Sequence, residues 1–170
     1  MSTYSIRTLG PGDMERSAAI IRRSFATVAA DFGLTRDNCP GNGAFLDTEK
    51  LHIDLERGVR MFGLFTAAGL SGFVAVKPRD GAVWYLEKLA VAPEWRHQGL
   101  GAALMTRAVA EVREQGGKSI SIGIIADNIR LMRWYERFGF RRSGTRRFAS
   151  LPFLVCYMSL DLEPPGGENT

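Results

Sequence analysis

The segment from residue 89 to residue 101 constrains the fold of this chain more than any other part of its sequence. It begins with an apolar run at residues 89–91, passes Pro93, and continues as RHQGLG at 96–101. From Leu100 onward, apolar residues recur at three- or four-residue spacing until Gly116. This order predicts a strand, a glycine-containing loop and a helix in direct succession.

The start of that helix is a candidate anion site. Exposed N–H groups and the positive end of the helix dipole attract negative charge there. Gly99 and Gly101 have no Cβ, so a phosphate group can approach the backbone closely. Arg96 adds a guanidinium whose shape suits phosphate oxygens. The segment therefore predicts a diphosphate site, although a two-glycine turn taken alone is more typical of a tight connection that binds nothing.

Two other phosphate-binding loops do not match this sequence. A dinucleotide-binding turn needs G-x-G-x-x-G and an acidic residue about 20 positions later. Here Gly101 is followed by Ala102, Ala103 and Leu104. A P-loop needs Gly-Lys followed by Ser or Thr, and that sequence is absent from the chain.

Hydrophobic periodicity divides the rest of the chain into short elements. Helices are expected at 14–32, ending at Gly33, at 47–57, from residue 100 to Gly116, and at 128–138. Residues 35–46 are expected to form a loop and 78–81 a turn. Strands are expected at 4–9, 59–65, 70–76, 83–91, 119–125, 140–148 and 153–160.

The strand at 83–91, the following helix and the strand at 119–125 form a β-α-β unit. Such a unit is nearly always a right-handed crossover between parallel strands. The upstream strands read as an antiparallel meander. We therefore expect an α+β fold of α/β/α layers, whose mixed sheet is mostly antiparallel and contains one parallel pair.

Length and composition limit the remaining possibilities. With 170 residues and 45% hydrophobic content, we expect one domain over 1–162 and a disordered tail at 163–170. Cys39 and Cys156 show no disulfide or zinc spacing, and no apolar run approaches the length of a membrane span. We therefore expect a cytoplasmic protein without a metal. The net charge of +4, concentrated in late arginines, suits an anionic ligand, and we expect no nucleic-acid or membrane partner.

Two ordered motifs resemble the GCN5-related N-acetyltransferase (GNAT) family. RHQGLG at 96–101 fits the family's Gln/Arg-x-x-Gly-x-Gly/Ala signature, and Asn128 followed by WYERFGF at 134–140 fits its second motif. The resemblance covers nearly the whole chain, although residues before Val59 match in outline alone. It implies a GNAT-like acyl-CoA N-acyltransferase fold with a splayed parallel strand pair, and acetyl-CoA as acyl donor.

The resemblance also implies which residues hold the donor. The pantetheine arm would pair with the strand that holds Leu89, and backbone amides from about Arg96 to Ala102 would hold the diphosphate. Asn128 would contact the pantetheine, orient the helix that follows, or serve as an ordinary N-cap. The implied set is Leu89, Ala90, Val91, Arg96, His97, Gln98, Gly99, Leu100, Gly101, Ala102 and Asn128.

Transfer to an amine needs a base for the amine and an acid for the departing thiolate. Tyr135 matches the family tyrosine that often protonates the thiolate, although a core aromatic is the alternative. Glu87 lies two and four residues before Leu89 and Val91, so regular alternation places these three on one face. It is the candidate base, although a structural ion pair is equally compatible. Tyr85 is a second choice, and neither His52 nor His97 is well placed for this role.

In the family, the acceptor pocket is built from the most variable segments. Candidate residues here are Phe25, Asp31, Phe32, Asn38, Phe45, Arg146, Phe148 and Phe153. Asp31 suits a cationic amine, and Arg146 or Arg147 suits a carboxylate. The sequence thus predicts an N-acetyltransferase, monomeric or homodimeric, that transfers acetyl from acetyl-CoA to a primary amine on a small molecule or a protein. The alternative is a catalytically silent acyl-CoA-binding sensor.

Overall fold

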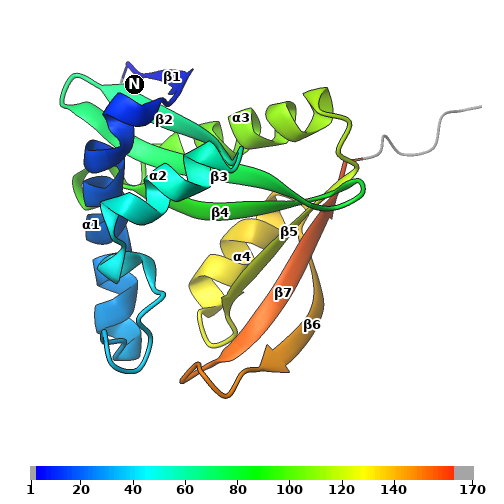
Figure 1. Ribbon diagram of the computed structural model, residues 1–170. Helices are drawn as coiled ribbons and strands as arrows, with labels where there is room; N and C mark the ends of the chain where they lie inside the picture. Colours follow the sequence, from blue (N-terminus) through cyan, green and yellow to red (C-terminus); the bar gives the residue numbers. More distant parts are fainter. Residues whose placement is uncertain (1–2, 163–170) are drawn as a thin grey trace, which may run out of the picture. The chain divides into compact units, whose positions relative to one another are not determined.

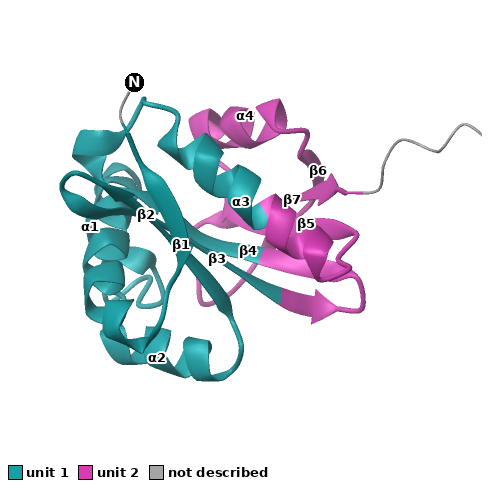
Figure 2. Cartoon of the chain, turned by 90° about the horizontal axis from the view of Figure 1, so that it is seen from above, with its two compact units in different colours: residues 1–77, 86–108 teal, residues 78–85, 109–170 magenta. Residues whose placement is uncertain are grey.

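The computed structural model describes residues 3–162, which form two compact units. The first unit contains the chain up to Lys77 together with Leu86–Ala108. The second contains Pro78–Tyr85 and the described residues from Val109 to Leu162. Figure 2 shows the two units in teal and magenta. The predicted tail at 163–170 lies outside the described residues.

The first unit is built on an antiparallel meander (Figure 1). Strand β1 (Ser5–Thr8) pairs with β2 (Arg60–Thr66), which pairs in turn with β3 (Gly69–Asp80). Helices α1 (Met14–Phe32) and α2 (Thr48–Glu56) precede β2 in the chain. Helix α1 ends where predicted, because Gly33 adopts a left-handed conformation with φ of 63°.

Both faces of this meander are covered by helices. Residues 61–64 of β2 and 71–76 of β3 are buried without alternation, which is typical of strands buried on both sides. On one side, Met14 and Ile21 of α1 and Leu51 of α2 share a core with Phe73. On the other, helix α3 (Leu100–Glu114) approaches Gly72 so closely that an added Cβ would lie 2.8 Å from Leu104. The predicted α/β/α layering is therefore present in this unit.

The second unit contains the parallel pair. Residues Val83–Tyr85 of β4 (Val83–Val91) pair in parallel with Ser119–Ser121 of β5 (Ser119–Ile125). Strand β7 (Leu154–Asp161) runs antiparallel to β5 and to β6 (Arg141–Arg147). Helix α4 (Ile129–Arg137) connects β5 to β6. The pairing order β1-β2-β3-β4-β5-β7-β6 confirms the predicted mixed, mostly antiparallel sheet.

One local prediction is wrong. The stretch 78–81 was expected to turn, yet β3 continues through Pro78 to Asp80 and the chain reverses at Gly81, where φ is 55°. Proline has no N–H to give to a neighbouring strand. The register of β2 against β3 ends at the Arg60–Val76 pair, so Pro78 lies beyond that ladder and its missing N–H costs no bond to β2.

The late arginines fall largely on an edge strand. All seven residues of β6 are exposed, and four of them are arginines. Arg142 pairs with Glu136 at 3.6 Å, and the Arg146 guanidinium lies 4.8 Å from the Phe148 ring centroid. Charged side chains on an edge strand oppose pairing with other chains. This structural role accounts for the clustering without a bound anion.

Candidate functional site

The predicted phosphate loop follows β4 and leads directly into α3. A 3-10 turn at Pro93–Trp95 comes first, and His97 and Gly99 then take left-handed conformations with φ of 62° and 78°. The N–H of Ala103 donates to the Gly99 carbonyl at 3.1 Å, which starts the helix. By helical geometry, the preceding amides of Leu100, Gly101 and Ala102 have no partner within the helix. They are available to an anion.

The space beside the loop suits such a ligand. A Cβ added at Gly99 would meet no protein atom within 4 Å among the described residues. A side chain there would nevertheless be strained, because left-handed φ values disfavour residues other than glycine. Because Gly99 has no side chain, the loop can take this left-handed conformation and its backbone stays accessible to a ligand. The geometry fits the predicted diphosphate site.

Arg96 is engaged differently from the sequence-based expectation. Its guanidinium donates to the Thr27 hydroxyl at 3.1 Å and to the Ser24 carbonyl at 2.9 Å, both on α1. Its backbone N–H donates to the Pro93 carbonyl at 3.3 Å. Arg23 on α1 also forms an ion pair with Glu94, in the turn before the loop, at 2.7 Å. Arg96 thus fixes the loop to α1, and the amides left for a phosphate begin after it.

The strand predicted to receive the pantetheine arm carries a backbone irregularity. Lys88 adopts a φ of 54° in the middle of β4, so the regular alternation assumed between Glu87 and Leu89 is interrupted. Ala90 is buried, whereas Leu89 and Val91 are partly exposed. Pairing of a ligand with this strand stays a prediction.

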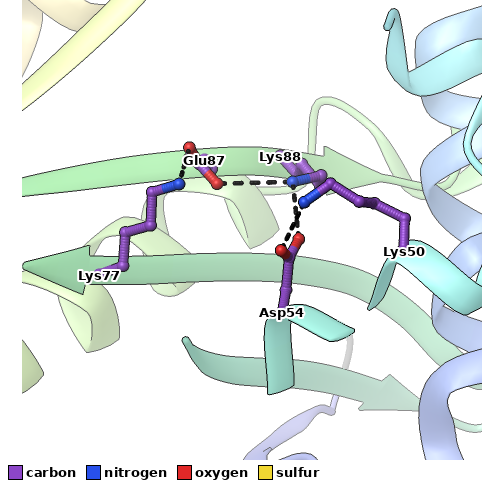
Figure 3. Close-up of polar contacts among 5 residues, drawn as sticks. All are labelled: Lys50, Asp54, Lys77, Glu87 and Lys88. Atoms are coloured by element: carbon purple, nitrogen blue, oxygen red, sulfur yellow. Dashed lines mark hydrogen bonds and ion pairs between the residues drawn. The ribbon is translucent and has the colours of Figure 1, made fainter. Parts of the chain in front are cut away.

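Glu87 lies within a chain of charged side chains from three elements (Figure 3). One carboxylate oxygen is 3.0 Å from Lys77 Nζ on β3, and the other is 3.5 Å from Lys88 Nζ. The Lys88 ammonium is also 3.7 Å from Asp54 on α2, and Asp54 pairs with Lys50 at 2.5 Å. Glu87 is therefore ion-paired, as the structural alternative expected, and its side chain is 29% exposed, which leaves it accessible to solvent.

Sequence reasoning missed Asp54 and Lys77. Asp54 is buried on the same face of α2 as Leu51, three residues earlier. A carboxylate at that spacing on an apolar stripe was the available signal, because burial of a charge requires nearby partners. Lys50 lies one helical turn earlier, at an i,i+4 spacing that the sequence shows, whereas Lys88 comes from β4 and no local pattern indicates its contact with Asp54.

Tyr135 lies in the second unit, in an aromatic environment. Its ring centroid is 5.1 Å from that of Trp134 and 5.3 Å from that of Phe140, in edge arrangements. The residue is buried, and this desolvation raises the pKa of the Tyr135 hydroxyl well above its usual range. Burial therefore keeps the hydroxyl neutral to a higher pH than in an exposed tyrosine, and the acid role of Tyr135 stays a prediction.

Asn128 begins α4 as an N-cap. Its side-chain oxygen accepts a hydrogen bond from the Leu131 N–H at 3.3 Å. The capping role that the sequence predicted is thus present. Contact with a pantetheine arm stays a prediction.

The candidate acceptor residues have mostly local contacts. Asn38 donates to the Gly33 carbonyl and accepts from the Thr35 N–H, so it shapes the loop after α1. Arg36 lies 5.4 Å from the Phe45 ring centroid, and Asp31 is exposed. The Tyr85 ring lies 5.1 Å from Arg79. The acceptor-pocket roles of Asp31, Asn38 and Phe45 stay predictions, as does the role of Tyr85 as a second candidate base.

Neither a metal centre nor a membrane span was found in the described part of the chain. Within residues 3–162, no group of three or more His, Cys, Asp or Glu side chains is arranged to hold a metal ion. No helix in the same range is long and apolar enough to cross a bilayer. Both cysteines are buried and free.

Comparison with protein families gives one match over most of the chain. The model described as acetyltransferase (GNAT) family matches residues 36–140. This range contains the phosphate loop, the charged chain around Glu87, and Tyr135. It therefore includes both candidate catalytic residues.

Curated relatives match over shorter stretches. An uncharacterized N-acetyltransferase of Mycobacterium tuberculosis H37Rv is 35% identical over 63 residues, which cover 37% of this chain and 40% of that protein. The ribosomal protein bS18-alanine N-acetyltransferase of Escherichia coli K12 is 32% identical over 62 residues, covering 36% and 42%. The alignments thus span about two fifths of the length of these relatives.

Solved structures agree on the fold. The ribosomal-protein-S18-alanine N-acetyltransferase of Escherichia coli superposes with a TM-score of 0.76 at 20% identity, covering 99% of both chains. YncA of Salmonella typhimurium, solved with acetyl-CoA, gives a TM-score of 0.71 at 18% identity, also covering 99% of both. At these identities the likeness establishes the fold, and the predicted N-acyltransferase fold is confirmed.

Proposed function

The chain belongs to the acetyltransferase (GNAT) family, and on that premise we propose that it transfers the acetyl group of acetyl-CoA to a primary amine. The observation that carries this proposal is the loop at the start of α3. Its left-handed Gly99 and the amides of Leu100, Gly101 and Ala102 form a backbone cradle suited to a diphosphate. YncA, which has the same fold, was solved with acetyl-CoA.

The proposed reaction is a direct transfer in a ternary complex. The neutral amine nitrogen attacks the thioester carbonyl carbon, the new C–N bond forms, and the C–S bond breaks. Before the attack, Glu87 accepts the proton of the ammonium through a water molecule. As the C–S bond breaks, Tyr135 donates its hydroxyl proton to the departing thiolate. The second proton, which the nitrogen loses on becoming an amide, passes through water to the Tyr135 oxygen and restores the hydroxyl. The partial solvent exposure of the Glu87 side chain supports the first role, and the match of Tyr135 to the family motif at 134–140 supports the second.

Donor binding is tested by calorimetric titration with acetyl-CoA, and separately with NADH, of the wild type and Gly101→Glu. The new carboxylate would lie at the amides that we assign to the diphosphate, so we expect Gly101→Glu to lose at least 10²-fold in acetyl-CoA affinity. Gly12→Glu is the matched control, because a Cβ at Gly12 meets no atom within 4 Å. Unchanged affinity in Gly101→Glu, or preference for NADH, would refute the donor site.

Acceptor class is tested by thiol release with three acceptors. Because the E. coli relative is named for alanine of a ribosomal protein, the first acceptor is a peptide with a free N-terminal alanine. The others are an N-blocked lysine peptide and a small polyamine. Turnover of at least one supports the proposed reaction. Acetyl-CoA binding without turnover of any amine would favour the sensor alternative.

A further inference from the structure

Asp54 is a buried carboxylate with two cationic partners of different exposure. Its side chain is 7% exposed, so its charge must be compensated by nearby groups. Lys50 is one partner, but its side chain is 53% exposed. Lys88, at 3.7 Å, is 21% exposed. The contact with Lys88 is the more shielded of the two, and it connects α2 to β4 (Figure 3).

Lys88 lies at a backbone position that needs support. A φ of 54° places it in the left-handed region, which residues other than glycine rarely adopt. Such a conformation persists where surrounding contacts hold it. The Lys88 ammonium lies between Asp54 and Glu87, at 3.7 and 3.5 Å. Both separations exceed the 2.7–2.9 Å usual for a charge-assisted bond, and the contact with Glu87 is a long hydrogen bond that Lys88 donates, so neither carboxylate binds the ammonium tightly.

We propose that Asp54 is a positioning residue for Glu87 and acts through Lys88. By holding the Lys88 ammonium on the α2 side, Asp54 keeps it from closing on the nearer Glu87 oxygen. That oxygen then stays available to accept a proton, while the other is held by Lys77 at 3.0 Å. This inference rests on the proposed function, in which Glu87 is the base.

The first test is a kinetic rescue with three variants. In Asp54→Asn, Lys88 is released toward Glu87, and we expect kcat to fall about tenfold while KM for acetyl-CoA stays within twofold. In the double variant Asp54→Asn/Lys88→Gln, the competing ammonium is gone, and kcat should return to within threefold of Lys88→Gln alone. Lys50→Gln is the matched control, because it removes the other partner of Asp54 and should leave kcat within twofold.

If Asp54→Asn were slow because its fold is damaged, the further substitution Lys88→Gln could not restore kcat. A double variant as slow as Asp54→Asn, or slower, would therefore overturn the proposal. So would a loss in Lys50→Gln equal to that in Asp54→Asn.

The second test does not depend on turnover. In a crystal structure of Asp54→Asn, the distance from Lys88 Nζ to Glu87 Oε2 should contract from 3.5 Å to about 2.8 Å. An unchanged or longer distance would overturn the inference. If the wild type turns over no amine, the proposed reaction fails, and this distance still decides whether Asp54 holds Lys88 away from Glu87.

Discussion

The surroundings of Glu87 and Tyr135, the two candidate catalytic side chains, are opposite in kind. Glu87 is partly exposed and faces two ammonium groups, whereas Tyr135 is buried between aromatic rings. The first environment stabilises a charged carboxylate. The second stabilises a neutral hydroxyl and raises the pKa of Tyr135. The contrast is thus between a carboxylate that water can reach and a hydroxyl-bearing ring that aromatic neighbours shield.

The largest effect on kcat is expected from a substitution that removes the charge of Glu87. We expect Glu87→Gln to lower kcat about 10²-fold with little change in acetyl-CoA affinity, because an ammonium cannot attack until it loses its proton. The loss should shrink as the assay pH approaches the pKa of the amine, since the acceptor then deprotonates itself. Steady-state rates across this pH range check the prediction.

Glu94 offers a matched control for that experiment. It is also ion-paired, with Arg23 at 2.7 Å, and both side chains are about half exposed. Because Glu94 helps to hold the phosphate loop to α1, any effect of Glu94→Gln should fall on KM for acetyl-CoA, and kcat at saturating acetyl-CoA should stay within twofold. A deficit in Glu87→Gln that stays constant with pH would show that Glu87 acts in some way other than as a base.

A smaller effect is expected at Tyr135. A thiol has a pKa near 8.5, so a thiolate departs more easily than most leaving groups and gains less from an acid. Tyr135→Phe should therefore lower kcat roughly tenfold while acetyl-CoA binds as in the wild type. Tyr157→Phe on β7 is the control and should leave kcat within twofold. Wild-type turnover in Tyr135→Phe would leave the tyrosine with a packing role alone.

The two environments also differ in how far the sequence predicts them. The second motif placed Tyr135 on a helix beginning at Asn128, and the cap is where the sequence indicated. Likewise, the apolar spacing that runs through Ala18, Ile21 and Phe25, with Gly33 as terminator, predicted the bounds of α1. These are local signals, because a helix face and its caps are encoded by residues three or four apart.

The contacts around Glu87 and the loop depend on distant parts of the chain. Arg96 bonds to Ser24, 72 residues away, so its direction cannot be read from RHQGLG. The left-handed Lys88 has no sequence signal either, since lysine is not typical of that conformation. The phosphate loop was therefore predictable as a backbone feature, whereas the side chains that hold it and the base in place were not.

The smallest expected effect tests the environment of Tyr135 without any substrate. An unfolded tyrosine loses its proton near pH 10, whereas the buried Tyr135 keeps its own to higher pH. The unfolded state then binds fewer protons than the folded one, so the free energy of unfolding falls as pH rises, by up to about 1.4 kcal/mol per pH unit from this group. Chemical denaturation between pH 8.5 and 11 should therefore show a steeper alkaline loss for the wild type than for Tyr135→Phe. The control is Tyr4→Phe, because Tyr4 is an exposed residue at 45%, and this variant should follow the wild-type slope. Parallel curves for wild type and Tyr135→Phe would mean that the hydroxyl is as well solvated when folded as when unfolded, and the contrast with Glu87 would lose its physical basis.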